Sequence, residues 1–223
     1  MSAPSDSSAQ PRASLTRERV LRAAIGLADE GGFESLTMRT LGKVLGVEAM
    51  SLYNHVTNKD DILDGIVDLV VGEIELPAEP DHWEAAIRTC AISAHEVLLR
   101  HHWVCGRMMS PRTIRPTRMR YIDWMLSRLR EGGFSAETIY HAYHALDSHI
   151  LGFTFWELGH MAGADEGPDF GPTFLKELPI GVYPDFAEHI KQHLAGSGLA
   201  DEGEFEFGLE LILDGLKRIR DAA

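Results

Sequence analysis

The amino-acid sequence predicts an all-α protein with a small N-terminal domain of three helices and a larger C-terminal helical domain. Three observations predict this class. Apolar residues recur every three to four positions through most of the chain, which is the spacing of one face of a helix. No stretch alternates apolar and polar residues for long enough to indicate a strand. The 223 residues suffice for two domains that each bury a core.

The chain is expected to divide into a disordered tail at residues 1–14, an N-terminal domain at 15–61 and a C-terminal domain at 62–223. The net charge of −13 is unevenly divided, because residues 1–59 hold seven Arg or Lys against six Asp or Glu, and residues 60–223 hold fourteen against twenty-eight. A near-neutral head can approach phosphates, whereas the acidic remainder repels them. Any contact with nucleic acid is therefore expected of the N-terminal domain.

Two short helices joined by a glycine turn are predicted after a first amphipathic helix at residues 15–30. Thr37 is expected to cap the first helix of the pair. Gly46 is expected to end it, because glycine adopts the left-handed backbone that leaves a helix without steric cost. The buried face of this helix is predicted to hold Leu41, Val44 and Leu45.

The second helix of the pair is predicted from about Glu48 to Val56, with Leu52 and Val56 facing inward. Asn58 is expected to start the next helix, with Asp61 placed close to a capping box. In a DNA-reading helix-turn-helix the second helix enters the major groove. The alternative is a helical hairpin that reads no DNA, since any such hairpin contains a glycine turn. The residues expected to contact DNA are Thr37, Arg39, Ala49, Met50, Ser51, Tyr53, Asn54, His55 and Lys59.

The expected contacts divide between the DNA backbone and the bases. Lys59 and Tyr53 are expected to hold phosphates, and Arg39 a phosphate or a guanine. Met50 is expected to meet a thymine methyl group, and Asn54 an adenine. Only the base contacts would carry sequence preference.

The run from Thr16 to Leu63 resembles the N-terminal domain of the TetR family of transcriptional repressors, most of all its tetracycline-repressor branch. The resemblance implies a DNA-binding repressor that dimerises through its last long helices and holds a small-molecule effector in its C-terminal domain. The alternative is a helical small-molecule-binding protein without DNA-binding activity. The matching motifs are Ala23-Ala24, Gly31-Gly32-Phe33, Leu36-Thr37-Met38-Arg39, Leu45-Gly46-Val47, Leu52-Tyr53-x-His55-Val56 and Asn58-Lys59.

The C-terminal domain is expected to be helical throughout. A helix at Ile62–Ile74 would connect the two domains, and the prolines at 77 and 80 end it. Further helices are predicted at Asp81–His101, Pro116–Arg130, Ser135–Met161, Tyr183–Ala195 and Glu204–Asp221.

Two of these helices carry small and apolar residues at alternating spacings of three and four. Each glycine inside a helix costs roughly 1 kcal/mol relative to alanine, and close approach of helix backbones explains such glycines. We expect two helices from each of two subunits to form a four-helix bundle in a homodimer, which also suits a palindromic operator. The alternative is packing within one chain. The expected interface residues are Ser148, Gly152, Phe155, Gly159, Phe205, Gly208, Ile212, Gly215 and Ile219.

The opposite face of the 135–161 helix mixes polar and apolar residues, which indicates either a cavity or a solvated edge beside ordinary core. Aromatic and methionine side chains with a few polar groups are typical of a pocket for a moderately apolar molecule. The residues expected to line an effector pocket are His95, Trp103, Met108, Met109, Trp124, Met125, Tyr140, His144, Asp147 and Leu151. Tetracycline itself is not expected, because the tetracycline branch implies a histidine where Met108 to Pro111 lacks one.

Residues 100–130 contain eight arginines and a single acidic residue, Asp123. Pairing with the acidic remainder of the domain is the first expectation, and attraction of an anionic effector is the alternative. No catalytic residue, metal ligand or cofactor is expected, since no metal-site, nucleophile or phosphate-loop motif is present. Two cysteines form no disulfide framework, and no apolar run reaches membrane-spanning length. A cytoplasmic protein is expected.

Overall fold

The computed structural model describes residues 14–78, 82–108, 115–163, 182–195 and 203–222, with the side chains of 160–163 and 192–195 left aside. The regular secondary structure of these residues is helical and includes no strand, as predicted. The chain forms two compact units, Met1–Ile66 and Val67–Ala223, so the division falls five residues later than expected from the sequence. The predicted tail lies outside the described residues except for Ser14.

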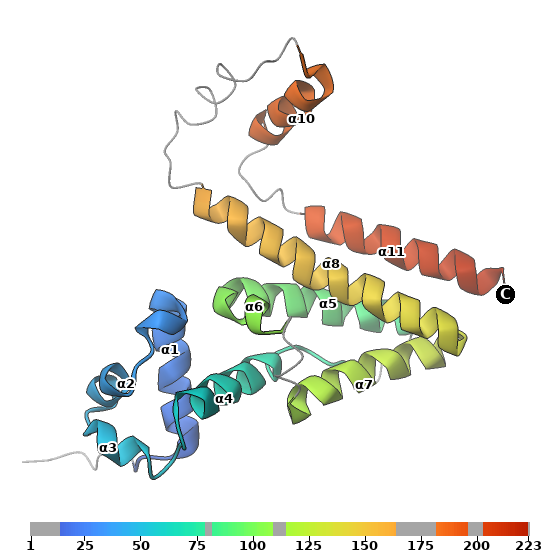
Figure 1. The fold of residues 1–223 in the computed structure, drawn as a ribbon. Helices are drawn as coiled ribbons and strands as arrows, with labels where there is room; N and C mark the ends of the chain where they lie inside the picture. Colours follow the sequence, from blue (N-terminus) through green and yellow to red (C-terminus); the bar gives the residue numbers. More distant parts are fainter. Residues whose placement is uncertain (1–13, 79–81, 109–114, 164–181, 196–202, 223) are drawn as a thin grey trace, which may run out of the picture. The chain divides into compact units, whose positions relative to one another are not determined.

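The first unit contains three helices and the start of a fourth (Figure 1): α1 (Arg17–Ser35), α2 (Met38–Leu45), α3 (Ala49–Leu52) and the beginning of α4 (Lys59–Val71). Side-chain caps define where these helices begin. The Thr37 hydroxyl accepts from the Thr40 backbone N–H at 3.0 Å, and Asn58 Oδ1 accepts from the Asp61 N–H at 2.8 Å. Both predicted caps are confirmed.

The first helix runs past its predicted end at Glu30. Gly31 and Gly32 are non-helical, with a φ of 65° at Gly32, and a last turn then continues to Ser35. The Ser35 hydroxyl donates to backbone carbonyls of this region, at 2.8 Å to Leu27 and 2.7 Å to Gly32. These local bonds hold the extra turn that the glycine pair by itself would have ended.

The second unit contains the rest of α4 and the remaining helices. The sequence predicted five of them and missed η1 and α6, which lie in the segment between the predicted helices at 81–101 and 116–130. They are α5 (Trp83–Arg100), η1 (His102–Val104), α6 (Cys105–Met108), α7 (Pro116–Glu131), α8 (Ala136–Gly163), α10 (Pro184–Ala195) and α11 (Glu204–Asp221).

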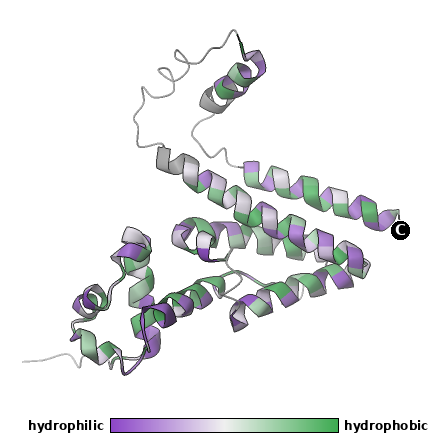
Figure 2. Ribbon diagram, viewed as in Figure 1, coloured by the Kyte–Doolittle hydropathy of each residue, from purple (hydrophilic) through white to green (hydrophobic). Residues whose placement is uncertain are grey.

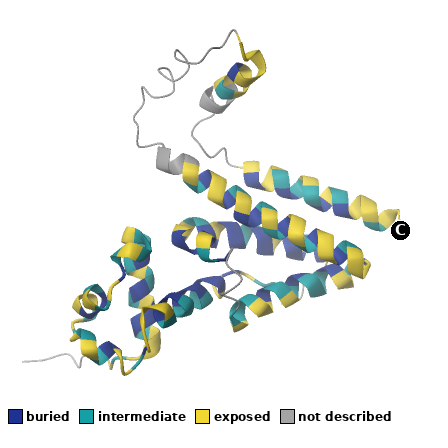
Figure 3. Ribbon diagram, in the orientation of Figure 1, coloured by how far each residue is buried: buried dark blue, intermediate teal, exposed yellow. Residues whose placement is uncertain are grey.

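Helix α5 lies at the centre of the second unit and packs against α7, α8 and α11. Its hydrophobic residues (green in Figure 2) coincide with its buried ones (dark blue in Figure 3). Ile87 and Leu98 of α5 belong to the core of this unit, together with Met125, Leu146 and Leu209. All five side chains are almost fully buried. Burying a leucine or methionine side chain stabilises a fold by about 1.5 to 3 kcal/mol. None of the described helices combines the length and apolar character that a bilayer crossing requires.

Candidate DNA interface and effector site

The turn between α2 and α3 depends on two glycines. Gly46 ends α2 with a φ of 67°, in the left-handed region that favours glycine. At Gly42 a Cβ would lie 2.9 Å from the Val47 carbonyl oxygen and 3.2 Å from the Ala49 nitrogen. The Val47 N–H also donates to the Gly42 carbonyl at 2.9 Å. The backbone that leads into α3 therefore passes directly over Gly42, and the predicted glycine turn is confirmed at Gly46.

The predicted second helix is shorter than expected. It spans Ala49–Leu52, and the chain then turns, with the Leu52 carbonyl accepting from both His55 and Val56. The prediction of helix to Val56 is wrong, because after Leu52 the backbone hydrogen bonds reach back three residues instead of four, from Tyr53 to Met50 at 3.3 Å and from Asn54 to Ser51 at 3.4 Å. The Arg17 guanidinium donates to the His55 carbonyl at 3.1 Å and pairs with Asp61 at 2.7 Å. These bonds tie the start of α1 to the end of this segment and the start of α4.

The short helix and its turn still present the side chains expected to read bases. Met50 is 75% exposed, Tyr53 and Asn54 are exposed, and Leu52 is fully buried. Ala49, Ser51 and His55 are half-buried. The candidate base contacts thus lie on an open face of the first unit.

Exposed cations lie on α2 and at the start of α4, the helices that precede and follow this segment. Arg39 is exposed in the first turn of α2, and Lys59 is exposed while its Nζ donates to the Phe33 carbonyl at 3.1 Å. Lysine has three donors, so this bond leaves two for a phosphate. Val44 is 58% exposed, which corrects its predicted place in the buried face. Lys43, exposed one turn after Arg39 on the same face of α2, is a further candidate that the i, i+4 spacing would have revealed.

A buried polar pair joins α5 to α8 in the second unit. The Thr154 hydroxyl donates to the Ile150 carbonyl at 2.6 Å, so its oxygen accepts a proton from His95 Nδ1 at 2.8 Å. His95 Nε2 then carries no proton and faces Glu157 Oε2 at 3.2 Å. Two acceptors at this distance require a shared proton. Phe205 stacks on the imidazole, with ring centroids 4.0 Å apart.

The electrostatics of this pair shift the two pKa values in opposite directions. Burial lowers the pKa of His95 to about 4, opposed by Glu206 and assisted by His149. Burial raises the pKa of Glu157, and the negative charges of Glu204 and Glu206 raise it further. These opposite shifts favour a proton on Glu157 over one on His95.

The pair predicts a specific effect of pH on stability. From pH 6.5 to about 4 the unfolded His95 binds a proton that the folded one does not, so folded-state stability is lost as the pH falls, by about 3 kcal/mol for this group. Glu157 acts in the opposite sense, because the folded chain binds its proton at a higher pH than the unfolded chain does. In Glu157→Gln the amide still donates to His95, but the opposing effect disappears.

We therefore expect the free energy of unfolding of Glu157→Gln to fall more steeply than that of the wild type between pH 6.5 and 4. Urea denaturation at intervals of half a pH unit measures both slopes. Equal slopes would show that Glu157 is ionised in the folded protein.

A second buried polar cluster lies between α7 and α8. Burial raises the pKa of Tyr121 well above its usual value and that of Tyr143 to about 12, and the carboxylate of Asp147 adds to both effects. Burial also raises the pKa of Asp147 against the attraction of Arg118. Arg118 Nη1 is buried and has no hydrogen-bond partner within the described residues. A buried unpaired donor costs about 1 to 3 kcal/mol, so this N–H is suited to an oxygen of a bound molecule.

Sequence reasoning found only Asp147 of this cluster. Arg118 and Tyr121 are three residues apart on α7, and Tyr143 and Asp147 are four apart on α8. These spacings place each pair on one helix face and were the signal that the sequence offered. That the two faces meet depends on helix packing.

The other residues predicted for the effector pocket do not gather in one place. His95, Trp103, Met108, Met125 and Leu151 are buried, and Met109 lies outside the described residues. Tyr140 is 61% exposed and His144 is exposed, its Nδ1 2.7 Å from the Tyr140 carbonyl oxygen. The prediction that these two residues line an internal cavity is therefore wrong. They lie on the outward face of the first turns of α8, whose opposite face buries Ile139 and Ala142.

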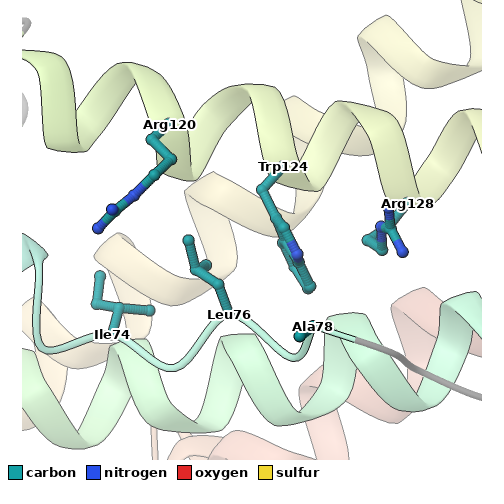
Figure 4. A pocket seen from close by; sticks show the side chains of 6 residues that line it. All are labelled: Ile74, Leu76, Ala78, Arg120, Trp124 and Arg128. Carbon is teal, nitrogen blue, oxygen red and sulfur yellow. The ribbon is translucent and has the colours of Figure 1, made fainter.

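Trp124 lies instead in an open groove of about 470 Å³ between α7 and the segment that follows α4. We call this the linker groove (Figure 4). It is lined by Ile74, Leu76, Ala78, Arg120, Trp124 and Arg128.

The predicted interface residues separate into two groups. Phe205 is buried against His95 and His149 of its own chain, and a Cβ at Gly208 would collide with the His149 ring. These two residues pack within one chain, as the alternative states, and Phe205 is too deeply buried in the protomer to meet a second subunit. Ile212 is half-buried in the protomer.

The remaining predicted interface residues lie on an exposed surface of α8 and α11. Phe155 is 61% exposed, and Ser148, Gly152, Gly159 and Ile219 are exposed as well. No heavy atom lies within 4 Å of a Cβ built at Gly152, Gly159 or Gly215. The structure adds Phe207 and Leu211, 69% and 61% exposed, which the sequence analysis missed. The α8–α11 surface thus comprises Ser148, Gly152, Phe155, Gly159, Phe207, Leu211, Gly215 and Ile219.

The described residues contain no cluster of three or more His, Cys, Asp or Glu side chains that would hold a metal ion. Cys90 and Cys105 are buried free thiols. Burial raises the pKa of the Cys90 thiol to about 12 and that of Cys105 to about 11. Neither thiol is therefore activated as a nucleophile.

Comparison with known proteins gives two family matches. Residues 20–66 match the model of bacterial regulatory proteins of the tetR family, and residues 76–220 match the tetracyclin repressor-like C-terminal domain. The HTH-type transcriptional repressor DrrR1 of Streptomyces coeruleorubidus is 30% identical over 217 residues, which are 93% of this chain and 79% of the relative. The class C tetracycline repressor of Escherichia coli is 30% identical over 210 residues, 92% of each chain.

Solved structures agree with these matches. Apo ActR from Streptomyces coelicolor superposes with a TM-score of 0.73 at 27% identity and covers 94% of this chain and 98% of its own. The complex of ActR with actinorhodin superposes with a TM-score of 0.71 at 28% identity, over 93% and 99% of the two chains.

Proposed function

The chain belongs to the tetR family of bacterial transcriptional regulators, as its N-terminal motifs predicted, and we propose that it is a homodimeric repressor released from a palindromic operator by a small-molecule effector. The observation that carries the proposal is the glycine-turned helix pair, which holds Met50, Tyr53 and Asn54 on an exposed face. Operator binding would place the protein in the bacterial cytoplasm.

A gel shift against the DNA upstream of the protein's own gene tests the proposal. Binding that is sequence-specific and competed by unlabelled operator supports it. Failure to bind any sequence from that region, by a protein that still binds small molecules, would support a ligand-binding protein without DNA-binding activity.

We assign base reading to Asn54 and Met50 and phosphate binding to Tyr53, Lys59, Arg39 and Lys43. The first two are exposed on the segment that would enter the major groove, and the cations flank it. Thr37 has a capping role in the free protein, since its hydroxyl accepts the Thr40 N–H. Ala49, Ser51 and His55 are half-buried and would make van der Waals contacts at the edge of the DNA interface.

Substitutions at Asn54 and Lys43 should therefore have different effects on DNA binding. Asn54→Ala should relax preference at one base position, at a cost of about 1 to 3 kcal/mol if its contact is bidentate. Lys43→Ala should weaken binding to all sequences alike and reduce the salt dependence of the binding constant by about one unit of slope. Quantitative gel shifts with a library of operator variants at several salt concentrations separate the two. Unchanged base preference in Asn54→Ala would remove it from the base readers.

The α8–α11 surface is proposed as the dimer interface. It exposes large apolar side chains beside glycines whose Cβ positions are open, and small residues permit two helices to approach closely. Gly208 of α11 packs on His149 of α8. On α11, Leu211 and Gly215 follow Gly208 by three and seven residues, and on α8, Gly152 follows His149 by three. The α8 residues and the α11 residues of the α8–α11 surface are thus neighbours. Two subunits that pair these surfaces about a two-fold axis would form a four-helix bundle.

The effector is proposed to bind inside the second unit, beside Arg118, Tyr121, Tyr143 and Asp147. The buried Arg118 Nη1 without a partner supports this position, and the structures of ActR with actinorhodin and with (S)-DNPA are those of a similar protein in complex with small molecules. Release requires that the effector bind the DNA-incompetent arrangement better than the competent one. A carboxyl or phenol oxygen on the effector would complete the hydrogen bonding of Arg118.

A further inference from the structure

The linker groove combines two arginines with an indole, and the repressor function does not require this combination. Arg120, Trp124 and Arg128 follow one another at intervals of four residues on α7, and the side chains of Arg120 and Trp124 extend toward the Ile74–Ala78 segment (Figure 4). At 1.5 Å rise per residue the two arginines start ~12 Å apart along the helix, with the indole between them. The buried Ile74 side chain contributes apolar surface opposite.

The indole is held in place by contacts with both sides of the groove. Trp124 Nε1 donates to the Pro77 carbonyl at 3.3 Å, which anchors α7 to the linker segment. The Arg128 guanidinium lies over the indole, 5.8 Å from its ring centroid. A ring fixed in this way offers a surface for stacking without losing further rotational freedom when a ligand binds.

The two arginines differ in their available charge. Arg128 pairs with Glu131 at 2.6 Å, and its Nε is buried without a hydrogen-bond partner among the described residues. Arg120 is exposed and makes no ion pair within the described part of the chain. Among the described residues that line the groove, Arg120 is thus the cation without a paired carboxylate, in a part of the chain that is strongly acidic as a whole. An anion that enters the groove would pair with Arg120.

We propose that the linker groove binds a small aromatic carboxylate, with its ring against Trp124 and its carboxylate paired with Arg120. The guanidinium fork matches the two oxygens of a carboxylate, and an aromatic ring matches the indole and the apolar side chains of Ile74 and Leu76. A volume of about 470 Å³ lies within the ~300 to 1,000 Å³ typical of small-molecule sites. No residue of the buried Arg118 cluster lines the groove, so the groove would be a second ligand site.

The test uses 2-naphthoate as the probe and isothermal titration calorimetry of the full-length protein. Its neutral isostere 2-naphthamide, which keeps the ring and loses the charge, is expected to bind at least tenfold more weakly, because hydrogen bonds to charged groups exceed neutral ones. Arg120→Gln is expected to weaken naphthoate binding by at least tenfold and to leave naphthamide binding unchanged. Arg130→Gln is the matched control, since Arg130 is exposed on the same helix and does not line the groove.

Three results would overturn the proposal. The first is the absence of naphthoate binding to a folded wild-type protein at millimolar concentration. The second is equal loss of binding in Arg120→Gln and Arg130→Gln, which would indicate general attraction by positive charge. The third is loss in Arg118→Gln with no loss in Arg120→Gln, which would place the probe in the buried cluster. Because Arg120 is exposed, its substitution leaves the core intact, and thermal unfolding of each variant verifies this.

Discussion

Replacing Leu211 with aspartate is expected to separate the dimer into monomers and to abolish tight operator binding. Leu211 is 61% exposed in the protomer, and in a two-fold interface each substitution introduces two carboxylates. A charge buried without a partner costs about 3 to 5 kcal/mol, so the dimer dissociation constant should rise by at least about a hundredfold. Analytical ultracentrifugation across a range of protein concentrations measures this constant. A gel shift on the same samples should show operator affinity falling in parallel.

A matched control comes from α8 itself. Phe155 and Tyr140 are both 61% exposed, but only Phe155 belongs to the α8–α11 surface. Phe155→Asp should therefore reproduce the effect of Leu211→Asp, and Tyr140→Asp should leave the dimer intact. A dimer that survives both Leu211→Asp and Phe155→Asp would show that subunits associate through another surface.

Substituting Gly42 with alanine is expected to destabilise the first unit and to weaken DNA binding. Alanine usually stabilises a helix relative to glycine by about 1 kcal/mol. At Gly42 the added methyl group would lie 2.9 Å from a backbone oxygen and 3.2 Å from a backbone nitrogen, which no side-chain movement can relieve. We expect a net loss of about 1 to 3 kcal/mol, as for other overpacked sites. Because the displaced segment, Val47 to Ala49, leads into α3, operator affinity should fall by at least about tenfold.

Gly26→Ala provides the control for this substitution. Gly26 is an exposed glycine of α1, and no heavy atom lies within 4 Å of the position that a Cβ would take there. Its replacement by alanine should therefore raise stability by up to about 1 kcal/mol. Urea denaturation compares the two variants with the wild type. If Gly42→Ala proved as stable as Gly26→Ala, the close approach over Gly42 would not constrain the turn.

The sequence by itself determined where most helices begin and end. Thr37, Gly46 and Asn58 act through hydrogen bonds and backbone angles that involve only a few neighbouring residues. The helix at Glu204–Asp221 was predicted with its observed bounds. The family was also evident from the sequence, because its motifs lie in one short continuous region.

Tertiary structure decided which faces of these helices are buried. The residue spacing on α11 predicted that one face, from Phe205 to Ile219, meets the second subunit. In the structure Gly208 of that face packs on His149 of its own chain, while Leu211, which was not predicted, is exposed. Periodicity fixes the positions of residues around one helix relative to each other. The face that meets a neighbour is set by how separate helices pack, which involves residues far apart in the chain.

The same reason explains the corrected sites. The Arg17 contacts to His55 and Asp61, which tie α1 to the turn after α3 and to the start of α4, join residues 38 and 44 positions apart. The polar cluster of Arg118 and Asp147 forms because α7 and α8 pack together, and Tyr140 is exposed because it lies on the face of α8 opposite the buried Ile139 and Ala142. Local hydrogen bonds and steric limits can be read from neighbouring residues, whereas burial and pairing between distant residues exist only once the helices have packed.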